Sequence, residues 1–389
     1  MENIWLISAV WIGLALVASA MQNCVAVSIA LLEIIIGAVA GNVITLTLTP
    51  WVNYLAGLGA ILLTFLAGAE IDMGVVRRHF ASTMTIGAVG FFAPYVGVLF
   101  FAHYVSSWPW AQAQIAGIAL STTSVAVVYA VMVETGFNET EIGKIILTAC
   151  FVNDLGTVLA LGIVFARYNI WMIVFAAATT VVLVALPLVA PWLFTRLGRR
   201  VSEPQIKFVL LVLFALGGLA DTVKSEAVLP AYLIGVALAP VFLKDRELMH
   251  RTRVIAFTIL TPFYFLKAGS LIRADVLVSG AGLILLYLGV KMVTKFFGIL
   301  PLTRIFRFQP KEGMYTTLLM STGLTFGSIS ALFGLTNHII DQRQYTILLT
   351  AVIGSAVVPT MIAQRWFQPE FKPLPRPHAA EAVSTAEGD

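Results

Sequence analysis

The sequence predicts an all-α polytopic membrane protein with about thirteen transmembrane helices, arranged as two inverted six-helix repeats with crossed broken helices. Three observations lead to this prediction. Apolar residues make up 59% of the 389 residues and charged residues only 11%, whereas a soluble domain carries about 25% charged residues. Apolar stretches recur along the whole length, and two of them contain small and hydroxyl residues that interrupt a helix. This composition excludes a soluble enzyme with one membrane anchor, a nucleic-acid-binding protein and a disordered scaffold.

A helix needs about 20 mostly apolar residues to cross the hydrocarbon core of a bilayer. Thirteen segments meet this requirement: residues 4–21, 26–47, 51–69, 82–105, 109–133, 140–165, 168–195, 205–222, 226–243, 253–270, 276–303, 313–334 and 343–365. Their connections are short, so one membrane domain is expected over residues 1–366. Residues 367–389 are polar and rich in Pro and Ala, which predicts a disordered cytoplasmic tail.

The basic residues predict the orientation of these segments. With the N-terminus outside, the inner loops and tail hold 17 of the 24 Lys and Arg residues, and the outer loops hold 5. Because cytoplasmic loops carry an excess of Lys and Arg, we expect the N-terminus outside and the C-terminus in the cytoplasm. This placement explains the net charge of +4 without a nucleic-acid partner.

A few ionisable residues remain at membrane depth, where each costs about 2.5–3.5 kcal/mol on insertion scales and is therefore a functional candidate. Asp154 lies in the middle of segment 140–165, and so short a side chain cannot reach the membrane surface. Its neighbour Asn153 points about 100° away on a helix. For Asn153, direct ligation and support of a neighbouring backbone are equally consistent with the sequence.

Three further charges lie inside apolar segments. Lys291 and Lys295 are four residues apart and share one helix face, so at least one of them needs a carboxylate partner or a lowered pKa. Glu33 also lies within an apolar segment. A structural or gating ion pair and a role in transport are equally consistent with its position.

Two segments are poor continuous helices. Segment 109–133 contains Ser121-Thr122-Thr123-Ser124, four side chains that can bond to the local backbone and open a helix. Segment 313–334 contains Ser321-Thr322-Gly323-Leu324-Thr325-Phe326-Gly327-Ser328, in which two glycines flank a hydroxyl residue. Backbone groups freed by such breaks must line a cavity.

The positions of the two breaks suggest an internal symmetry. If segment 168–195 is a linker helix, residues 4–165 and 205–365 form two units of six segments, and the linker inverts the second unit. Each break then falls in the fifth segment of its unit. Matched interruptions in two inverted halves predict a transport site at the midplane, where Asp and Lys side chains can balance opposed helix ends.

One carboxylate in such a site can hold a proton or coordinate a small cation through oxygen, and the two compete. Hydroxyls of Thr122, Thr123 and Ser124 and freed carbonyls would supply further oxygen ligands. These ligands suit Na⁺, Li⁺ or K⁺, since a divalent ion would need more carboxylates. The residues therefore predict the exchange of a monovalent cation for protons, with the cation bound at Asp154 and no cofactor.

At these residues the chain resembles the monovalent cation:proton antiporter superfamily, in particular the bacterial Na⁺/H⁺ exchangers and the Kef-type K⁺/H⁺ antiporters. The resemblance covers residues 4–366. It rests on the lysine segment together with the stretches LLEIIIGAVAGN, LGAILLTFLAGAEID, STTSV, FVNDLG, PFYFLKAG and MSTGLTFGSISALFGL.

The resemblance implies a thirteen-helix inverted-repeat fold, a homodimer, a mobile core domain and a bacterial cytoplasmic membrane. It implies that Asp154 is the essential cation- and proton-binding aspartate, with Asn153 as its partner. Lys295 matches the family's Lys-x-x-Gly, although Lys291 remains open, and Thr123 and Ser124 match the first unwound helix. The chain has Asn-Asp where well-known electrogenic members have Asp-Asp, which favours one cation per proton, but it carries Lys where electroneutral members carry Arg.

The sequence leaves three alternative functions to compare with this prediction. A K⁺/H⁺ antiporter would share every residue above. A sodium-coupled organic-solute symporter also uses crossed broken helices, but it would predict more polar ligands for Na⁺ and a larger cavity. An intramembrane enzyme is disfavoured, because all five His residues lie in or near loops or the tail.

Overall fold

The computed structural model describes residues 4–22, 28–44, 46–71, 73–135, 137, 140–165, 170–197, 202–222 and 227–369. The expectation of a disordered C-terminal tail concerns mainly residues 370–389, which lie outside this part of the chain. The helices up to the middle of the chain are α1 (Ile4–Gln22), α2 (Ile29–Val43), α3 (Pro50–Ala69), α4 (Met73–Arg78), α5 (Phe80–Phe100), the π-helix η1 (Phe101–Val105), α6 (Trp110–Ser121), α7 (Val125–Thr135), α8 (Glu141–Val164) and α9 (Ile170–Leu197).

The remaining helices are α10 (Pro204–Thr222), α11 (Val228–Lys244), α12 (Arg246–Ile255), η3 (Ala256–Leu260), α13 (Thr261–Ser270), α14 (Ala274–Ser279), α15 (Ala281–Ile305), α16 (Pro310–Met320), α17 (Thr325–Thr336), α18 (Gln342–Ile362) and η4 (Ala363–Phe367). The described residues contain no strand, so the predicted all-α class is confirmed. Eight helices or pairs of consecutive helices in the described chain are long and apolar enough to cross a membrane, and three shorter apolar helices accompany them.

Helices lie at every segment that the sequence predicted as a span, with some differences in detail. Segment 253–270 is preceded by helix from Arg246, because the Asp245 carboxylate accepts a hydrogen bond from the Leu248 N–H and caps α12. Segment 276–303 is divided at Gly280 into the short α14 and the long α15. Segments 109–133 and 313–334 are each split into two helices.

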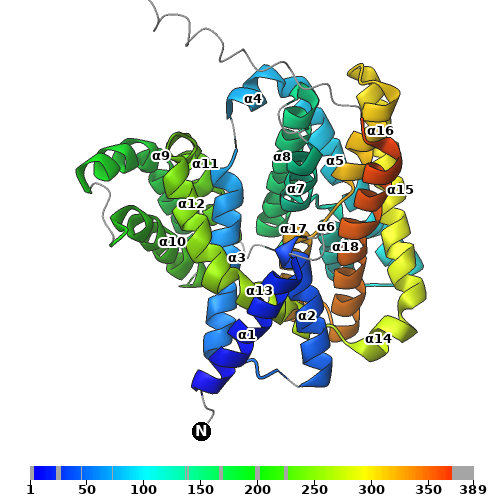
Figure 1. Cartoon of the computed structure of the whole chain (residues 1–389), viewed down its shortest axis with the longest axis horizontal. Helices are drawn as coiled ribbons and strands as arrows, with labels where there is room; N and C mark the ends of the chain where they lie inside the picture. The colour runs from blue at the N-terminus through cyan, green and yellow to red at the C-terminus, as the bar shows by residue number, and fades with distance from the viewer. Residues whose placement is uncertain are drawn as a thin grey trace, which may run out of the picture.

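The helices pack in two groups. The α3 group consists of α1 to α3 and α9 to α13, and the α8 group consists of α4 to α8 and α14 to α18. The α3 group occupies the left and lower centre of Figure 1 and the α8 group the right. The chain enters the groups in the order α3 group, α8 group, α3 group, α8 group, so each group receives helices from both halves of the sequence.

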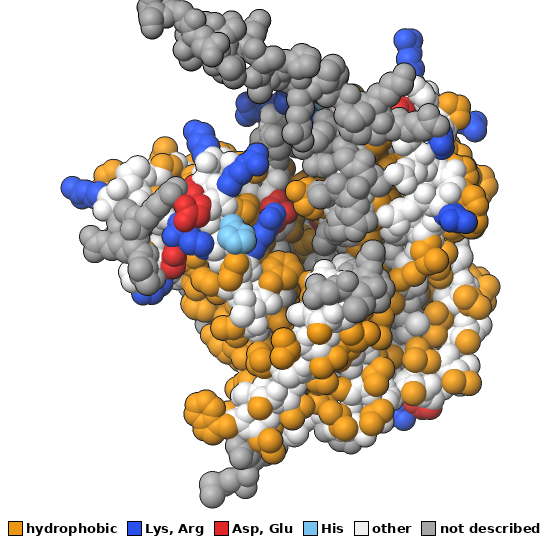
Figure 2. All heavy atoms as spheres, viewed as in Figure 1, with side chains coloured by type: hydrophobic (Ala, Val, Ile, Leu, Met, Phe, Trp, Pro, Cys, Tyr) orange, Lys and Arg blue, Asp and Glu red, His pale blue; other side chains and the backbone are white. Residues whose placement is uncertain are grey.

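Glycines allow close helix packing within the α3 group. A Cβ atom at Gly68 of α3 would collide with the Tyr232 carbonyl of α11, and one at Gly269 of α13 would collide with the Ile34 carbonyl of α2. Small residues of this kind let helix backbones approach in a membrane, where lipid-facing surfaces gain little from hydrophobic burial. The surface is apolar over much of the face in Figure 2, and most of the Lys and Arg side chains visible there lie at the upper end.

Hydrogen bonds join the two groups at the α14 end, the lower end of Figure 1. Three buried tyrosines carry bonds between the groups: Tyr345 donates to the Ala268 carbonyl (2.7 Å), Tyr232 to the Phe151 carbonyl (2.9 Å, nearer the middle of the helices) and Tyr264 to the Ser328 hydroxyl (3.5 Å).

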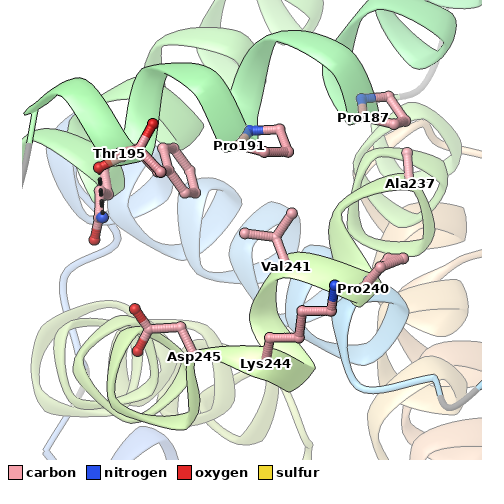
Figure 3. A pocket seen from close by; sticks show the side chains of 10 residues that line it. Pro187, Pro191, Thr195, Ala237, Pro240, Val241, Lys244 and Asp245 are labelled. Atoms are coloured by element: carbon pink, nitrogen blue, oxygen red, sulfur yellow. Dashed lines mark hydrogen bonds between the residues drawn. The ribbon is translucent and has the colours of Figure 1, made fainter.

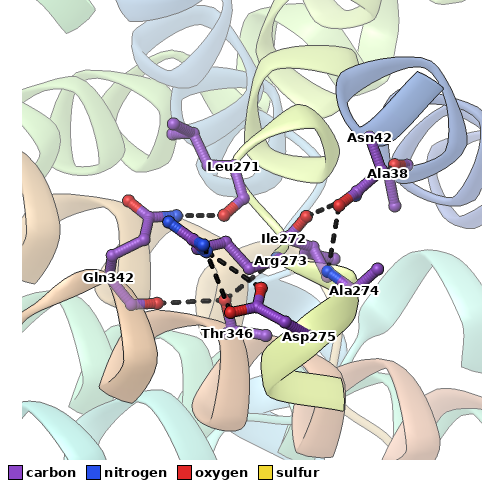
Figure 4. Close-up of polar contacts among 9 residues, drawn as sticks. All are labelled: Ala38, Asn42, Leu271, Ile272, Arg273, Ala274, Asp275, Gln342 and Thr346. Atoms are coloured by element: carbon purple, nitrogen blue, oxygen red, sulfur yellow. Dashed lines mark hydrogen bonds and ion pairs between the residues drawn. The ribbon is translucent and has the colours of Figure 1, made fainter. Parts of the chain in front are cut away.

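The segment between α13 and α14 is held from both groups (Figure 4). Asn42 of α2 donates to the Ile272 carbonyl (2.7 Å) and accepts from the Ala274 N–H (2.9 Å). From the other side, Thr346 of α18 accepts from the Arg273 N–H (3.2 Å), and Gln342 donates to the Leu271 carbonyl. This set of contacts, here called the α14 clamp, ties α2 to α18.

Candidate functional site

The break between α6 and α7 follows from its hydroxyl side chains. Ser121 donates to the Ile118 carbonyl (2.9 Å) and Thr122 to the Ala119 carbonyl (3.1 Å), so these side chains satisfy carbonyls that the next helical turn would have used. Thr122 is extended (φ −64°, ψ 154°), and helix resumes only at Val125. The four side chains from Ser121 to Ser124 are all buried.

Two more freed carbonyls find partners on other helices. The Ser121 carbonyl accepts from Asn153 Nδ2 of α8 (3.3 Å), and the Thr122 carbonyl accepts from Lys291 Nζ of α15 (3.2 Å). Buried backbone groups without partners are costly, so these contacts stabilise the break in the interior of the α8 group.

The second break, residues 321–324, meets the first. Thr123 donates to the Met320 carbonyl at the end of α16 (2.8 Å), and the Ser124 N–H donates to the Thr322 hydroxyl (3.4 Å). Contacts between α6 and α17 accompany these bonds. The structure therefore brings together the two interruptions that the sequence predicted almost 200 residues apart.

The acidic residue predicted for the site lies in α8, which packs against α6, α16 and α17. Asp154 is 2% exposed and Asn153 is completely buried. Among the described residues, Asp154 Oδ1 and Asn153 Oδ1 have no hydrogen-bond partner. Because a buried polar atom without a partner is unfavourable, each of these two oxygens is a candidate acceptor for a cation or a proton.

The two lysines predicted for the site bind different parts of the first break. Lys295 Nζ donates to the Thr123 hydroxyl (2.9 Å), whereas Lys291 Nζ donates to the Thr122 carbonyl and to the Ser355 hydroxyl of α18 (2.9 Å). Both lysines are completely buried. Within the part of the chain that the structure describes, neither forms an ion pair with Asp154 within 4.0 Å.

The residues predicted for the second unwound segment are placed by backbone contacts. A Cβ atom at Gly323 would collide with Lys291 Nζ, and one at Gly327 would lie 2.9 Å from the Ala119 carbonyl of α6. Thr325 is the first residue of α17, and its carbonyl accepts from the Ser328 hydroxyl. The two glycines therefore allow close approach. Gly323 lies in the break, whereas Thr325 and Gly327 lie in α17.

Glu33 lies apart from this arrangement. It belongs to α2, which packs against α1 and α13 in the α3 group. Its side chain is 2% exposed, Oε2 has no hydrogen-bond partner, and no ion pair of Glu33 is found among the described residues. Glu33 is therefore not brought to the breaks.

Ser355 and the buried Tyr232 are site neighbours that the sequence reasoning missed. Ser355 is a single hydroxyl in the apolar α18, and Tyr232 bonds the Phe151 carbonyl close to Asp154 along α8. A lone Ser or Tyr in an apolar span gives no signal of its own, since both are common at helix interfaces.

Two open pockets of the described residues lie away from the breaks. One of about 610 Å³ separates α9 from α11, where Pro187 and Pro191 face Ala237 and Val241 (Figure 3). Another of about 650 Å³ lies between the end of α15, the start of α16 and η4. The described residues contain no group of three His, Cys, Asp or Glu side chains suited to a metal ion. A buried oxygen site for one cation thus remains as the candidate site.

The chain is similar to known membrane transporters. Residues 12–368 match the model of the family described as "Sodium/hydrogen exchanger, transmembrane". A probable Na⁺/H⁺ antiporter of Methanocaldococcus jannaschii is 25% identical over 86% of this chain and 88% of its own length. A Na⁺/H⁺-K⁺ antiporter of Bacillus cereus is 22% identical over 85% of this chain and 88% of its own length.

The fold is also similar to a solved structure. A sodium/proton antiporter from Methanocaldococcus jannaschii superposes with a TM-score of 0.71, at 14% identity, over 93% of this chain and 98% of the other. This likeness concerns the fold alone. The family model covers nearly the whole described membrane region, and the resemblance expected from the sequence is confirmed. The chain belongs to the sodium/hydrogen exchanger family of membrane transporters.

Proposed function

We propose that the protein is a secondary active antiporter that exchanges a monovalent cation, with Na⁺ and Li⁺ favoured, for protons. One observation carries the proposal: Asp154 Oδ1 and Asn153 Oδ1 are buried oxygen acceptors without partners beside two crossing helix breaks. In a member of this family, such a position supports binding of the transported ions. Cation and proton then compete for Asp154, because the carboxylate that coordinates the cation is the group that accepts the proton.

The proposed ligands follow from which oxygens are free. Asn153 donates its amide N–H to the Ser121 carbonyl, which leaves Oδ1 as an acceptor next to the Asp154 carboxylate. Thr122 and Thr123 use their hydroxyl hydrogens on carbonyls. Thr123 also accepts from Lys295, so it keeps one oxygen lone pair for a cation, in addition to those of Thr122. Ser124 accepts from the Val127 N–H and has one further lone pair. A single carboxylate with neutral oxygens suits a monovalent ion.

The lysines balance charge in this proposal. An ammonium near the site favours the ionised form of Asp154, and an incoming cation takes over that role. Lys295 reaches the break through one hydroxyl, and a Lys side chain has three donors. It therefore has donors left for the carboxylate when no cation is bound.

Alternating access is proposed to arise from movement of the α8 group against the α3 group. The breaks and Asp154 belong to the α8 group, and the α14 clamp and the tyrosine bonds join the groups toward one end. The ions would then exchange toward the opposite end, where α4 and α12 lie. Opening the α14 end requires these bonds between the groups to break.

The order of the groups along the chain supports the proposed domain organisation. Residues 4–165 and 205–365 would be inverted repeats, each contributing first to the α3 group and then to the α8 group, with residues 168–195 as the linker helix. We further propose a bacterial cytoplasmic membrane, with the N-terminus outside and the C-terminus in the cytoplasm, and a homodimer as the working assembly. The excess of Lys and Arg in the loops on the inner side supports this orientation.

Exchange by purified protein in proteoliposomes tests the site. With an imposed pH gradient and external Na⁺, Asp154→Asn should reduce exchange to the level of empty liposomes, because the amide cannot cycle a proton. Asp275→Asn makes the same chemical change on the surface and should keep wild-type exchange. Wild-type rates for Asp154→Asn, with folded protein, would contradict the site assignment.

K⁺/H⁺ exchange is the second candidate, and it is favoured by the name of the Bacillus cereus relative, which includes K⁺. The same proteoliposome assay distinguishes Na⁺/H⁺ exchange from K⁺/H⁺ exchange. Rates in Na⁺, Li⁺ and K⁺ at equal concentration rank the cations, and a K⁺ ionophore that clamps the voltage during Na⁺ exchange reports whether transport moves net charge. A rate in K⁺ above those in Na⁺ and Li⁺ would reverse the preference proposed here.

A further inference from the structure

Lys291 and Lys295 have different surroundings although they share one face of α15. Lys291 Nζ donates to a backbone carbonyl of the first break (3.2 Å) and to Ser355 Oγ of α18 (2.9 Å), whereas Lys295 Nζ donates to one hydroxyl, that of Thr123. A carbonyl held by the backbone cannot turn away. Lys291 is therefore held by a backbone carbonyl of the first break and by a second helix, whereas Lys295 is held by one side chain of the first break.

The hydroxyl of Ser355 is oriented for this contact. Its O–H donates to the Val352 carbonyl one turn earlier in α18 (2.7 Å), and the Gly323 carbonyl lies at 3.4 Å. With its hydrogen directed to a carbonyl, the oxygen presents a lone pair to the lysine. Ser355 is completely buried.

Lys291 also touches the second break. A Cβ atom at Gly323 would collide with Lys291 Nζ and would lie 2.9 Å from Thr122 Oγ1 and 3.2 Å from Ser355 Oγ. One ammonium thus contacts Thr122 in the first break, the Gly323 backbone in the second, and α18. The carbonyl end of α6 carries a partial negative charge, which favours a cation there.

We infer that Ser355 is a positioning residue, which holds Lys291 between the two helix breaks so that their oxygens keep the spacing that the cation needs. In this arrangement Lys291 keeps its contacts during the transport cycle, and Lys295 is the lysine that exchanges partners with Asp154. The inference rests on the proposed function and adds to it a division of roles between the lysines.

The variant Ser355→Ala tests this role in the proteoliposome assay with Na⁺. A hydrogen bond to a charged group contributes about 1.5–3 kcal/mol, so the KM for Na⁺ should rise about tenfold or more, while the maximal rate stays within about twofold. Ser355→Thr retains the hydroxyl and should restore most of the affinity. Ser330→Ala is the matched control: Ser330 is also buried, but its hydroxyl bonds only a carbonyl of its own helix.

A double-mutant comparison separates positioning from simple packing. Ser355→Ala and Lys291→Gln should be non-additive in the KM for Na⁺, because both remove the same contact, whereas Ser355→Ala and Lys295→Gln should add. Equal KM values for Ser355→Ala and wild type, or equal values for the Ala and Thr variants, would overturn the inference. Asp154→Asn keeps the outcomes distinct: if it abolishes exchange while Ser355→Ala is unchanged, only the role of Ser355 fails, and if Asp154→Asn exchanges normally, the proposed function fails.

Discussion

Different interactions hold the helices in place at the two ends of the molecule. Toward the α14 end, hydrogen bonds from Tyr264, Tyr345 and the α14 clamp cross between the α3 group and the α8 group. At the opposite end, the ion pairs found among the described residues each stay inside one group. Arg253 binds Glu70 (2.6 Å) and Arg251 binds Glu203 (2.8 Å) within the α3 group, and His79 contacts Glu141 (2.7 Å) within the α8 group.

This difference indicates at which end the structure opposes movement between the α3 group and the α8 group. Bonds within a group keep its shape and do not resist its displacement, whereas bonds between groups must break when the groups separate. Toward the α14 end, hydrogen bonds therefore oppose separation of the two groups. Substitutions at the two ends should consequently affect different properties of the protein.

The largest effect is expected for Tyr345→Phe. The change deletes only a hydroxyl, and it leaves the buried Ala268 carbonyl without the partner that it has at 2.7 Å. The cost of about 1–3 kcal/mol should raise opening at the α14 end about tenfold. Hydrogen exchange of the amides of residues 268–275, followed by mass spectrometry, measures this opening. Tyr54→Phe, at an exposed position of α3, is the control, and unchanged exchange in Tyr345→Phe would contradict the comparison.

A smaller effect is expected for Arg253→Gln at the other end. The Arg253 and Glu70 side chains are 43% and 29% exposed, and pairs of this kind contribute up to about 1 kcal/mol. The variant should lower thermal stability slightly and leave hydrogen exchange at residues 268–275 as in wild type. Faster exchange there would show that the two ends are not independent.

The smallest effect is expected from pH on the α14 clamp. The hydrogen bond from Arg273 lowers the pKa of the exposed Asp275 carboxyl below its ordinary value of 3.8. A group with a lowered pKa contributes above its ordinary pKa and loses that contribution only as pH falls through the lower folded value. Exchange at residues 271–275, corrected for the intrinsic pH dependence of amides, should therefore be constant between about pH 5 and about pH 8. A midpoint inside that range would assign the clamp to another titrating group.

Much of the fold could be predicted because membrane-spanning segments are recognised by their length and apolar composition. Helices lie at the predicted segments, and the two interruptions were visible as a run of hydroxyl residues before Val125 and as the glycines at 323 and 327. Asp154 could be identified because few charged residues lie inside the apolar segments, where the membrane makes a charge costly. These features are local in sequence, and each depends on the chemistry of a few adjacent residues.

The parts that could not be predicted depend on which helices are neighbours. Lys291 and Lys295 are equivalent on the face of an isolated helix, and only the positions of Ser355 and Thr122 make them different. Tyr345 and Tyr264 are, in the sequence, ordinary aromatic residues of apolar segments. Tyr264 bonds a residue 64 positions away, and Tyr345 bonds one 77 positions away. No periodicity within one segment predicts contacts over such distances in the sequence.

The bonds between the two groups have one more consequence. They join tyrosine hydroxyls, a serine, a threonine, an amide side chain and backbone groups, all of them neutral. Mobile ions screen interactions between charges, and they screen dipolar contacts inside a protein far less. The α14 end should hold with the same strength in dilute and in concentrated electrolyte. The hydrogen bonds between the α3 group and the α8 group should therefore keep their strength when transport changes the ionic strength around the protein.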